Sequence, residues 1–587
     1  MVHAICDGHA YEYTYDSQGK LKEKRANGKL LVSYTYDSTG NITEIQDPAG
    51  ISIRYEYDLL GRMTCIHSGQ GMKVQYGYDS LDRIEHIHYG NGVQTNYAYD
   101  CGNISHLETK TESAVLLSFD YQYDGNGNRT AKTGIQGLTA GSSALDIRYQ
   151  YDVRGQLLEE CRNGDAVRYV YDAAGNRIRK TEGEKETRYH YNQKNQLLQK
   201  ENTDGINYFT YDRQGGIIEE KNAAGNRRFT YNSLHQQTQV ETETGNIQKN
   251  RYDAEGLRYE LIENGRRTSF VYHNGELLHE KGEEAGLSKE TTSYHLGAGI
   301  EAFQRDRKTF YYHQDEQLNT TLISDENAAI RNHYQYDAFG AGLDVVEDLP
   351  NRIRYTGQQY DEQTEQYYLR ARYYNPVLGR FMQEDVYQGD GLNLYAYCRN
   401  NPVVYYDPSG YGKEYNNGLN EIPQADKGFD KWYDSTDWRE FDQIWKDKSL
   451  RNYIESQIRD PGALHEWLMT GRADTMRYWG VSMDEIKLNR DEILGLKFEN
   501  PKGAHGKKGS GKAHAEIRKM IDSSLNYDNF VRRLHTWADY RLPDIIINGR
   551  TYPGSARLPG NLRNQEAIDF IDRLYDEQNK ANSCGGK

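Results

Sequence analysis

Two aspartates and one arginine near the middle of the chain have side chains that could do acid–base chemistry together: Asp385, Asp407 and Arg372. Two carboxylates that come close do not both ionise easily, so one can act as a base on water while the other donates a proton to a carbonyl. A nearby guanidinium keeps its charge and can tune that pair or hold an oxyanion. The 22 residues between the two acids leave their proximity open, and Asp-Pro sequences also form plain turns.

A second group of candidate side chains lies in the tail, within GAHGKKGSGKAHAEIRK (residues 503–519). The candidates are Lys507, Lys508, Lys512, His505, His514 and Glu516. Small residues let a backbone approach a phosphate, and the lysines would add positive charge. The histidines and the glutamate could act as general base, general acid or metal ligands. The combination is compatible with a nuclease, and a flexible basic surface loop is the structural alternative.

Several established motifs are absent from this tail. It contains no HExxH metal motif, and GKKGSGK differs from a Walker loop in its spacing. No HxE–PCxxC arrangement of a zinc deaminase occurs. His535 and Asp539 stand four residues apart and share one helix face, where packing is the expected role of His535. The cofactor is left undetermined, with a divalent metal as one option for this domain.

The overall composition excludes some classes of protein. The 587 residues carry a net charge of −15, which argues against wholesale binding to nucleic acid or membrane, although a local patch can differ. Six cysteines without a CxxC pair indicate neither a zinc site nor a disulfide framework. No segment reaches the roughly 20 apolar residues that span a bilayer, and no signal peptide is visible. Because Met1 stands just ahead of a repeat unit, we expect the tail of a longer protein.

A repeat in the first part of the chain supplies the elements that must position the central residues. The sequence Tyr-x-Tyr-Asp, or a close variant, ends at Asp16, Asp37, Asp58, Asp79, Asp100, Asp124, Asp152, Asp172, Asn192, Asp212, Asn232 and Asp253. Nine of the eleven intervals are 20 or 21 residues, which is typical of a repeat protein. The pattern loosens after about Gly265 and returns at Asp337.

Each repeat unit predicts a β-hairpin. Tyr34 and Tyr36 stand two residues apart, so on a strand their rings share one face. Asp37 opens a turn by binding nearby backbone N–H groups, and Gly40 supplies a conformation that only glycine adopts cheaply. A hairpin alone cannot bury its face, so neighbouring units must pair into a continuous sheet. We expect the tyrosines to form packing ladders with no ligand role.

These units resemble the YD repeats of the RHS family, which also occur in the C components of insecticidal toxin complexes and in teneurins. The resemblance covers about residues 1–410, and period, acid, glycine and tyrosine spacing all agree. It implies a mainly β fold in which hairpins spiral into a hollow shell around a cargo domain. Because this length supplies fewer units than a complete shell of the family, we expect this chain to build only part of the wall.

The segment IRYTGQQYDEQTEQYYLRARYYNPVLGRF (residues 353–381) resembles the RHS-associated core that ends such a shell. The resemblance implies three regions: a repeat shell over 1–340, the core over 341–411, and a C-terminal variable domain over 412–587. Cores of this family resemble aspartyl autoproteases that release their own C-terminal domain just after a DPxG motif, which here is DPSG at 407–410.

Carried over residue by residue, the resemblance makes Asp385 and Asp407 the catalytic pair and Arg372 the supporting cation. It places the cut between Tyr411 and Gly412. Two other arginines, Arg370 and Arg380, are close competitors for the supporting role. The chain departs from the family at Asp385-Val386, where Asp-Pro is usual, and this puts the backbone support of the first acid in question.

The composition changes abruptly after Gly412. All six tryptophans but only 8 of the 51 tyrosines lie beyond it. Residues 413–500 carry a net charge of −5 and residues 501–587 a net charge of +5. Apolar spacing predicts a separate, mainly helical domain with helices over 441–458, 463–471, 513–525 and 527–542.

By position, this domain resembles the variable toxin tip of polymorphic toxins used in competition between bacteria. Such tips include nucleases, deaminases and ADP-ribosyltransferases, and the last are not excluded because their motifs are short. The resemblance implies a secreted or cell-surface protein delivered to a target cell, a cognate immunity protein, carrier proteins, and nucleic acid as the substrate of a nuclease tip. Two alternatives stay open: a non-enzymatic surface protein whose repeats bind carbohydrate or a neighbouring cell, and a degenerate toxin remnant.

Overall fold

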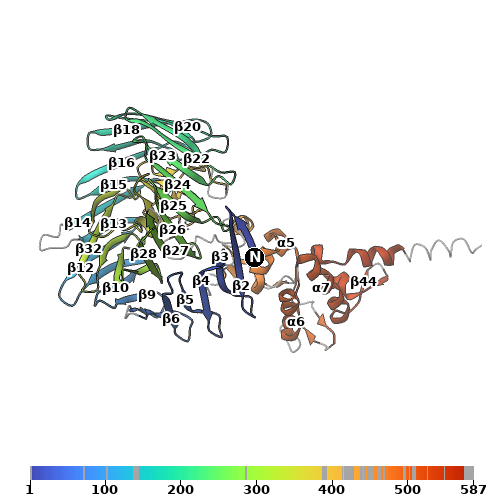
Figure 1. Cartoon of the computed structure of the whole chain (residues 1–587). Coiled ribbons are helices and arrows are strands. Elements are labelled where there is room, and N and C mark those ends of the chain that lie inside the picture. Colours follow the sequence, from blue (N-terminus) through green and yellow to red (C-terminus); the bar gives the residue numbers. More distant parts are fainter. Residues whose placement is uncertain are drawn as a thin grey trace, which may run out of the picture. The chain divides into compact units, whose positions relative to one another are not determined.

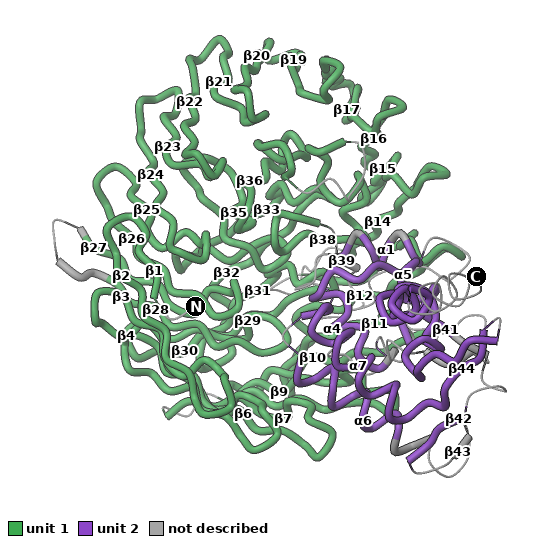
Figure 2. The backbone as a smooth tube through the Cα atoms, turned by 90° about the vertical axis from the view of Figure 1, so that its right-hand side faces the viewer, with its two compact units in different colours: residues 1–418 green, residues 419–587 purple. Residues whose placement is uncertain are grey.

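The computed structural model describes residues 3–69, 73–100, 103–136, 144–284, 287–386, 393–412, 414–415, 429–436 and, with further short gaps, 441–573. The chain divides into two compact units, residues 1–418 and 419–587, which are drawn in green and purple in Figure 2. The first unit is built almost entirely of strands (Figure 1). The predicted mainly β fold is therefore confirmed.

A single antiparallel sheet forms the wall of the first unit, and each of its 33 strands pairs with the next one along the chain. The first strands are β1 (His3–Cys6), β2 (His9–Tyr15), β3 (Leu21–Ala26), β4 (Lys29–Tyr36), β5 (Ile42–Gln46), β6 (Ser52–Tyr57), β7 (Met63–Ser68), β8 (Lys73–Tyr78), β9 (Ile84–Tyr89), β10 (Gln94–Asp100) and β11 (Asn103–Lys110). The next are β12 (Val115–Tyr123), β13 (Arg129–Gln136), β14 (Ala144–Tyr151), β15 (Leu157–Arg162), β16 (Asp165–Tyr171), β17 (Arg177–Glu182), β18 (Lys185–Tyr191), β19 (Leu197–Asn202), β20 (Gly205–Tyr211), β21 (Ile217–Asn222) and β22 (Gly225–Tyr231). The last are β23 (Gln237–Glu241), β24 (Ile247–Tyr252), β25 (Arg258–Glu263), β26 (Arg266–His273), β27 (Glu276–Glu284), β28 (Leu287–Leu296), β29 (Ile300–Arg305), β30 (Lys308–Gln314), β31 (Thr320–Ser324), β32 (Ile330–Tyr336) and β33 (Gly342–Glu347).

The turn between β4 and β5 shows why the repeat folds as a hairpin. One carboxylate oxygen of Asp37 accepts hydrogen bonds from the backbone N–H groups of Thr39, Gly40 and Asn41 at 2.9, 2.6 and 2.9 Å. Gly40 has a φ of +104°, which lies in the region that favours glycine. Tyr34 and Tyr36 both pack against the same hydrophobic core. The predicted hairpin with its aspartate turn is thus present.

The last tyrosine of most repeat motifs has a second task that packing alone does not explain. Its hydroxyl donates a hydrogen bond to a backbone carbonyl near the start of the preceding hairpin strand, as Tyr78 does to Met63 at 2.6 Å. The same bond recurs for Tyr36, Tyr57, Tyr99, Tyr123, Tyr151, Tyr171, Tyr191, Tyr231, Tyr252 and Tyr272. These units are therefore joined to their neighbours by a buried or half-buried hydrogen bond as well as by the strand ladder.

The sheet winds back on itself, so strands far apart in sequence lie side by side (Figure 1). Polar contacts mark this seam between the early and the late strands. Lys24 forms an ion pair with Asp253 at 3.2 Å, and Lys132 with Asp315 at 2.8 Å. Between them lie the hydrogen-bonded pairs Asp47–His279, Ser68–Gln304 and Asn91–Ser324. The wall is consequently a spiral whose successive turns are joined by buried polar groups.

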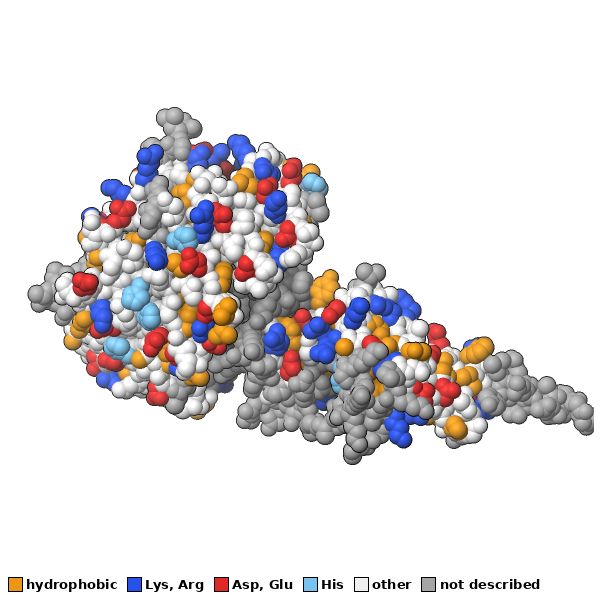
Figure 3. Space-filling view, turned by 90° about the horizontal axis from the view of Figure 1, so that it is seen from below, with side chains coloured by type: hydrophobic (Ala, Val, Ile, Leu, Met, Phe, Trp, Pro, Cys, Tyr) orange, Lys and Arg blue, Asp and Glu red, His pale blue; other side chains and the backbone are white. Residues whose placement is uncertain are grey.

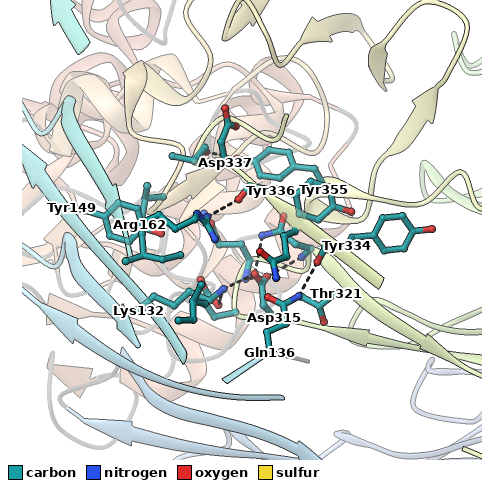
Figure 4. A pocket seen from close by; sticks show the side chains of 18 residues that line it. Lys132, Gln136, Tyr149, Arg162, Asp315, Thr321, Tyr334, Tyr336, Asp337 and Tyr355 are labelled. Atoms are coloured by element: carbon teal, nitrogen blue, oxygen red, sulfur yellow. Dashed lines mark hydrogen bonds and ion pairs between the residues drawn. The ribbon is translucent and has the colours of Figure 1, made fainter. Parts of the chain in front are cut away.

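A small cavity of about 40 Å³ lies in this seam (Figure 4). Lys132 binds Asp315 and Glu316 there, at 2.8 and 3.0 Å. Arg162 donates to the carbonyl of Tyr336 at 2.7 Å, and Gln136 to that of Tyr334 at 2.8 Å. The cavity has room for only a few water molecules, and its polar groups bind one another. The polar side chains around the cavity join the successive turns of the wall.

The segment that follows the wall folds as a plug within it (Figure 2). It contains a four-stranded sheet of β34 (Gln359–Asp361), β35 (Gln366–Leu369), β36 (Arg372–Asn375) and β37 (Arg380–Phe381), followed by β38 (Tyr405–Tyr406). Its buried tyrosines belong to the same hydrophobic core as the wall strands. Arg258 on the wall and Asp361 on the plug form a fully buried, two-point ion pair at 2.5 and 3.0 Å.

The second unit has its own hydrophobic core. Its described helices are α1 (Phe429–Ser435), α4 (Ala473–Tyr478), α5 (Met483–Leu488), α6 (Ser510–Asp522) and α7 (Tyr527–Arg541). Three short strand pairs accompany them: β40 (Leu464–Glu466) with β41 (Arg490–Glu492), β42 (Lys497–Phe498) with β43 (Gly503–Ala504), and β44 (Ile545–Ile547) with β45 (Arg550–Tyr552). The two helices predicted over 513–525 and 527–542 are confirmed as α6 and α7.

One predicted helix of the second unit is wrong. Residues 463–471 were expected to be helical, but β40 occupies Leu464–Glu466 and pairs with β41. Pairing with a strand more than twenty residues away overrides local helix preference in so short a segment.

The described surface of the first unit shows no field of a single charge sign on the face seen in Figure 3. On the face of the first unit seen in Figure 3, Lys and Arg side chains are interspersed with Asp and Glu. A mixed surface of this kind lacks the single-sign field that draws a polyanion. Among the described residues, no helix has the length and apolarity to cross a membrane.

Candidate functional site

The hairpin between β35 and β36 carries the central arginine. Leu369 ends β35, Arg372 begins β36, and the two residues face each other across the ladder. The tip is a tight turn in which Ala371 N–H donates to the Leu369 carbonyl at 2.7 Å. Arg370 adopts a φ of +59° there, a conformation that costs free energy for a residue with a side chain. The plug core around this hairpin holds it in place.

Arg372 brings the two predicted acids together. Its Nη2 lies 2.7 Å from Asp385 Oδ2 and 3.5 Å from Asp407 Oδ2. The three side chains are 6%, 4% and 2% exposed, so water screens these charges little. The guanidinium carbon stands 3.5 Å from the ring centre of Phe381, which adds a cation–π contact. One buried cation is thus shared by two buried carboxylates.

The DPSG turn is folded tightly against this cluster. Asp407 Oδ1 accepts from Gly410 N–H at 2.7 Å and from the Ser409 hydroxyl at 3.3 Å. Gly410 has a φ of +73°, and a Cβ at this position would overlap the carbonyl oxygen of Leu369. Arg372 Nε donates to the carbonyl oxygen of Gly410. The residue at 410 must therefore be glycine, and its carbonyl is held beside both acids.

The chain turns outward immediately after this glycine. Tyr411 is 50% exposed, and its N–H donates to Ser409 Oγ at 3.2 Å. Gly412 is partly exposed. The bond predicted as the cut thus joins the first residues that follow the buried turn.

Valine follows Asp385 where proline is usual in the family, and Asp385 has these backbone contacts. Asp385 N–H donates to the carbonyl of Leu394 at 3.0 Å, and Arg372 Nη1 donates to the same oxygen at 3.2 Å. Both bonds involve groups that a valine at 386 does not disturb. Val386 itself is 72% exposed. The contacts that hold the acid are thus formed with a valine at position 386.

The structure separates the three arginines that compete for the supporting role. Arg380 donates to the carbonyl of Asn195 at 2.6 Å and stacks between Tyr191 and Tyr395. Arg370 binds the carbonyl of Gly275 at 2.7 Å. Of the three, Arg372 is the one with ion pairs to both acids. Sequence reasoning ranked the arginines by family position alone and assigned no separate role to Arg370.

The predicted residues of the tail are only partly described. His505, Lys507 and Lys508 lie outside the described residues, and the side chain of Lys512 is also outside them. His514 and Glu516 both lie on α6, two positions apart, so they point to different sides of the helix.

Glu516 is engaged with the neighbouring helix. It accepts from Trp537 Nε1 at 2.8 Å and from Arg541 Nε at 3.0 Å. On the same helix, His535 binds the carbonyl of Leu562 at 2.8 Å and Asp539 accepts from Ser555 N–H at 2.7 Å. These contacts brace the fold of the second unit. Within the described part of the chain, no three His, Cys, Asp or Glu side chains are grouped to hold a metal ion.

A spiral of tyrosine-tied hairpins, closed by a plug that buries an Arg–Asp–Asp cluster, defines a YD-repeat shell protein. The family model of the teneurin YD-shell matches residues 7–121 and 101–404, together more than half of the chain. The chain belongs to the teneurin YD-shell family.

Two bacterial proteins and one solved structure show the range of its relatives. The tRNA3(Ser)-specific nuclease WapA of Bacillus spizizenii is 38% identical over 173 residues, which cover 27% of this chain and 7% of that protein. Toxin protein Tse5 of Pseudomonas aeruginosa is 36% identical over 101 residues, or 17% of this chain and 8% of that protein. The crystal structure of TcdB2-TccC3-TEV matches with a TM-score of 0.59 at 18% identity, covering 68% of this chain and 24% of its own. The matches span less than a tenth of the two sequence relatives, and the structural likeness concerns the fold alone.

Proposed function

We propose that the core of this protein cuts its own chain between Tyr411 and Gly412 and thereby frees the C-terminal domain. The observation that carries the proposal is the position of Arg372, which binds both Asp385 and Asp407 and also holds the Gly410 carbonyl. A charge-balanced structural pair needs one carboxylate for one guanidinium. The second buried acid here, Asp407, stands four residues before Tyr411, whose bond to Gly412 is the one to be cut.

The proposed reaction is hydrolysis by an acid pair. Burying two carboxylates with a single counter-charge favours one proton shared between them. The ionised acid takes a proton from water, whose oxygen bonds to the Tyr411 carbonyl carbon, while the protonated acid donates to the carbonyl oxygen. The carbon–nitrogen bond to Gly412 then breaks and the leaving nitrogen takes up a proton. Arg372 keeps the turn and the acids in register throughout.

We further propose that the released domain is the effector of a polymorphic toxin, and that it acts as a nuclease. Two of the relatives, a tRNA3(Ser)-specific nuclease and a toxin protein, support the toxin class. The separate core of residues 419–587 supports a domain that can act after release. In this proposal the lysines at 507, 508 and 512 bind the nucleic-acid backbone, and His505, His514 and Glu516 supply acid–base groups, with or without a divalent metal. A nucleic-acid target, an immunity protein, carrier proteins and delivery outside the producing cell belong to the same proposal.

Expression of the full chain followed by a denaturing gel tests the first step. We expect two fragments from the natural sequence and one full-length band from Asp407→Asn. A single full-length band from the natural sequence would refute self-cleavage. For the second step, residues 413–587 are expressed in bacteria beside a His514→Ala variant. Growth arrest with degraded RNA or DNA, lost in the variant, supports the nuclease, and harmless expression of both contradicts it.

A further inference from the structure

Three consecutive carbonyl oxygens of the DPSG turn are each held by one of three consecutive residues of the β35–β36 hairpin. Arg370 Nη1 donates to the carbonyl of Pro408. Ala371 N–H donates to the carbonyl of Ser409 at 3.1 Å. Arg372 Nε donates to the carbonyl of Gly410. Residues 370–372 therefore bind the carbonyl oxygens of the three residues at 408–410, which precede the proposed cut.

Arg370 differs from Ala371 and Arg372 because its side chain also binds residues of the shell wall. Its Nε donates to the carbonyl of Gly275 at 2.7 Å, and its Nη2 pairs with Glu276 Oε1. Both partners lie where β26 turns into β27. Gly275 has a φ of +83°, which favours glycine, and a Cβ there would stand 2.7 Å from Arg370 Nε. One planar side chain with donors in a fixed fork thus joins the wall to the turn.

Arg370 does not touch either acid. Its partners are the carbonyls of Pro408 and Gly275 and the carboxylate of Glu276. It cannot serve as the cation that tunes the acid pair, which is the place of Arg372. What its contacts fix is the orientation of the peptide that leads into Ser409 and Gly410.

We propose that Arg370 is a positioning residue for self-cleavage, which ties the DPSG turn to the 274–276 hairpin so that the bond is presented to the acids only when the wall is in place. The inference rests on the proposed self-cleavage. A displacement of about 1 Å at a reacting bond can slow a reaction roughly a hundredfold. Loss of this tie is therefore expected to slow cleavage while leaving the acids intact.

Because Arg370 has a φ of +59°, glycine is a suitable substitution at this position. Glycine adopts this conformation freely, so Arg370→Gly removes the side chain without disturbing the hairpin backbone. Arg307 is a matched control, because it is an exposed arginine at a hairpin tip with a φ of +64°. Arg370→Lys keeps a positive charge that can bind one of the three partners.

The test measures self-cleavage of the full chain over time at several pH values. We expect Arg370→Gly to cut at least tenfold more slowly than the natural sequence, Arg370→Lys to fall between them, and Arg307→Gly to match the natural sequence. The pH dependence of the rate should keep its midpoints in Arg370→Gly, because the acids keep their neighbours. Thermal unfolding should stay within a few degrees. A shifted pH profile or a large loss of thermal stability would mean that Arg370 acts otherwise.

Amide hydrogen exchange gives a readout that does not depend on cutting. In an Asp385→Asn background, which keeps the chain whole, the Gly410 amide should exchange faster once Arg370→Gly is added. Unchanged exchange together with unchanged cleavage overturns the role of Arg370 alone. A natural sequence that never cuts overturns the proposed function and this role together, so the two failures can be told apart.

Discussion

Two buried arginine–aspartate clusters of the first unit differ in one respect that separates structure from chemistry. Asp361 lies at 0% exposure between two arginines: it contacts Arg258 twice, and Arg352 Nη1 stands 3.4 Å from its Oδ1. Arg372 has two aspartates for one guanidinium and stands where the chain leaves the core. In the first cluster one carboxylate has two guanidinium partners, and the cluster joins wall to plug. The second is unbalanced in the opposite sense, with two carboxylates on one guanidinium, which is the arrangement expected of a reacting acid pair.

The largest effect should come from breaking the buried Arg258–Asp361 pair. Asp361→Ala leaves the Arg258 guanidinium buried without its carboxylate, which costs about 3–5 kcal/mol of unfolding free energy. Glu362→Ala is the control, because Glu362 pairs with Arg354 from a side chain that is 76% exposed, and exposed pairs contribute about 0–1 kcal/mol. Chemical denaturation of the full chain measures both. Equal losses in the two variants would contradict the structural role of the Arg258–Asp361 pair.

The second prediction is that acidic pH lowers the stability of the wall. Burial lowers the pKa of His295 to about 4 from an ordinary value of 6.5, although nearby Asp47 opposes the shift. Burial likewise lowers the pKa of His273 to about 4 and that of His313 to about 3. These imidazoles are neutral in the folded wall but protonate in the unfolded chain. Stability is therefore complete above about pH 6.5 and falls as the pH drops toward 4.

The size of this effect is testable at one residue. A depression of the His295 pKa from 6.5 to about 4 corresponds to about 3 kcal/mol once the unfolded chain is fully protonated. His295→Phe removes the titrating group from its buried site, so the slope of unfolding free energy against pH between 6.5 and 4 should become shallower. Thermal unfolding at several pH values measures the slope. A slope that does not change would rule out His295 as a contributor.

The third prediction tests the backbone geometry of the DPSG turn beside the Arg372 cluster. Gly410→Ala places a Cβ onto the Leu369 carbonyl oxygen, in a backbone conformation that already disfavours side chains. The turn must shift, so self-cleavage should be lost. Gly61→Ala is matched, with a φ of +80° and open space around the added Cβ. The control pays only the conformational cost of about 1–2 kcal/mol and should still be cut. Equal cleavage of both variants would show that the turn geometry is unimportant.

The smallest effect should come from the uncharged ties between repeats. Tyr78→Phe removes one hydroxyl that binds the Met63 carbonyl, at a cost of about 0.5–1.5 kcal/mol. Tyr208→Phe serves as the control, since the Tyr208 side chain is 52% exposed and its loss should be near zero. Denaturant midpoints of the two variants decide the matter. No difference between them would mean that the tyrosines contribute by packing alone.

The wall was predictable from the sequence because its information is local and repeated. The period, the aspartate turn and the glycine at Gly40 each specify one hairpin, and repetition specifies the sheet. Contacts between turns of the spiral were not predictable, since Lys24 and Asp253 are separated by 229 residues. The bonding of tyrosine hydroxyls to carbonyls also escaped, because sequence shows a ring and leaves its partner unstated.

The candidate site was predictable only through family resemblance. Spacing alone left Asp385 and Asp407 unconnected, and only the fold shows the guanidinium that joins them. Arg370 was considered only as a rival of Arg372, because its partners at Gly275 and Pro408 lie 95 and 38 residues away. In the second unit, the strand at 464–466 was mistaken for a helix, since its pairing partner begins at Arg490.

The most direct test of the account is the mass of the fragments that the full chain yields after folding. We predict two species from the natural sequence, with the second beginning at Gly412, and a single intact chain from Asp385→Asn and from Asp407→Asn. Asp361→Asn should still be cut wherever it folds, because Asp361 pairs with Arg258 and Arg352 and belongs to the other cluster. An intact natural chain, or equal cutting in the Asp407→Asn variant, would contradict the account.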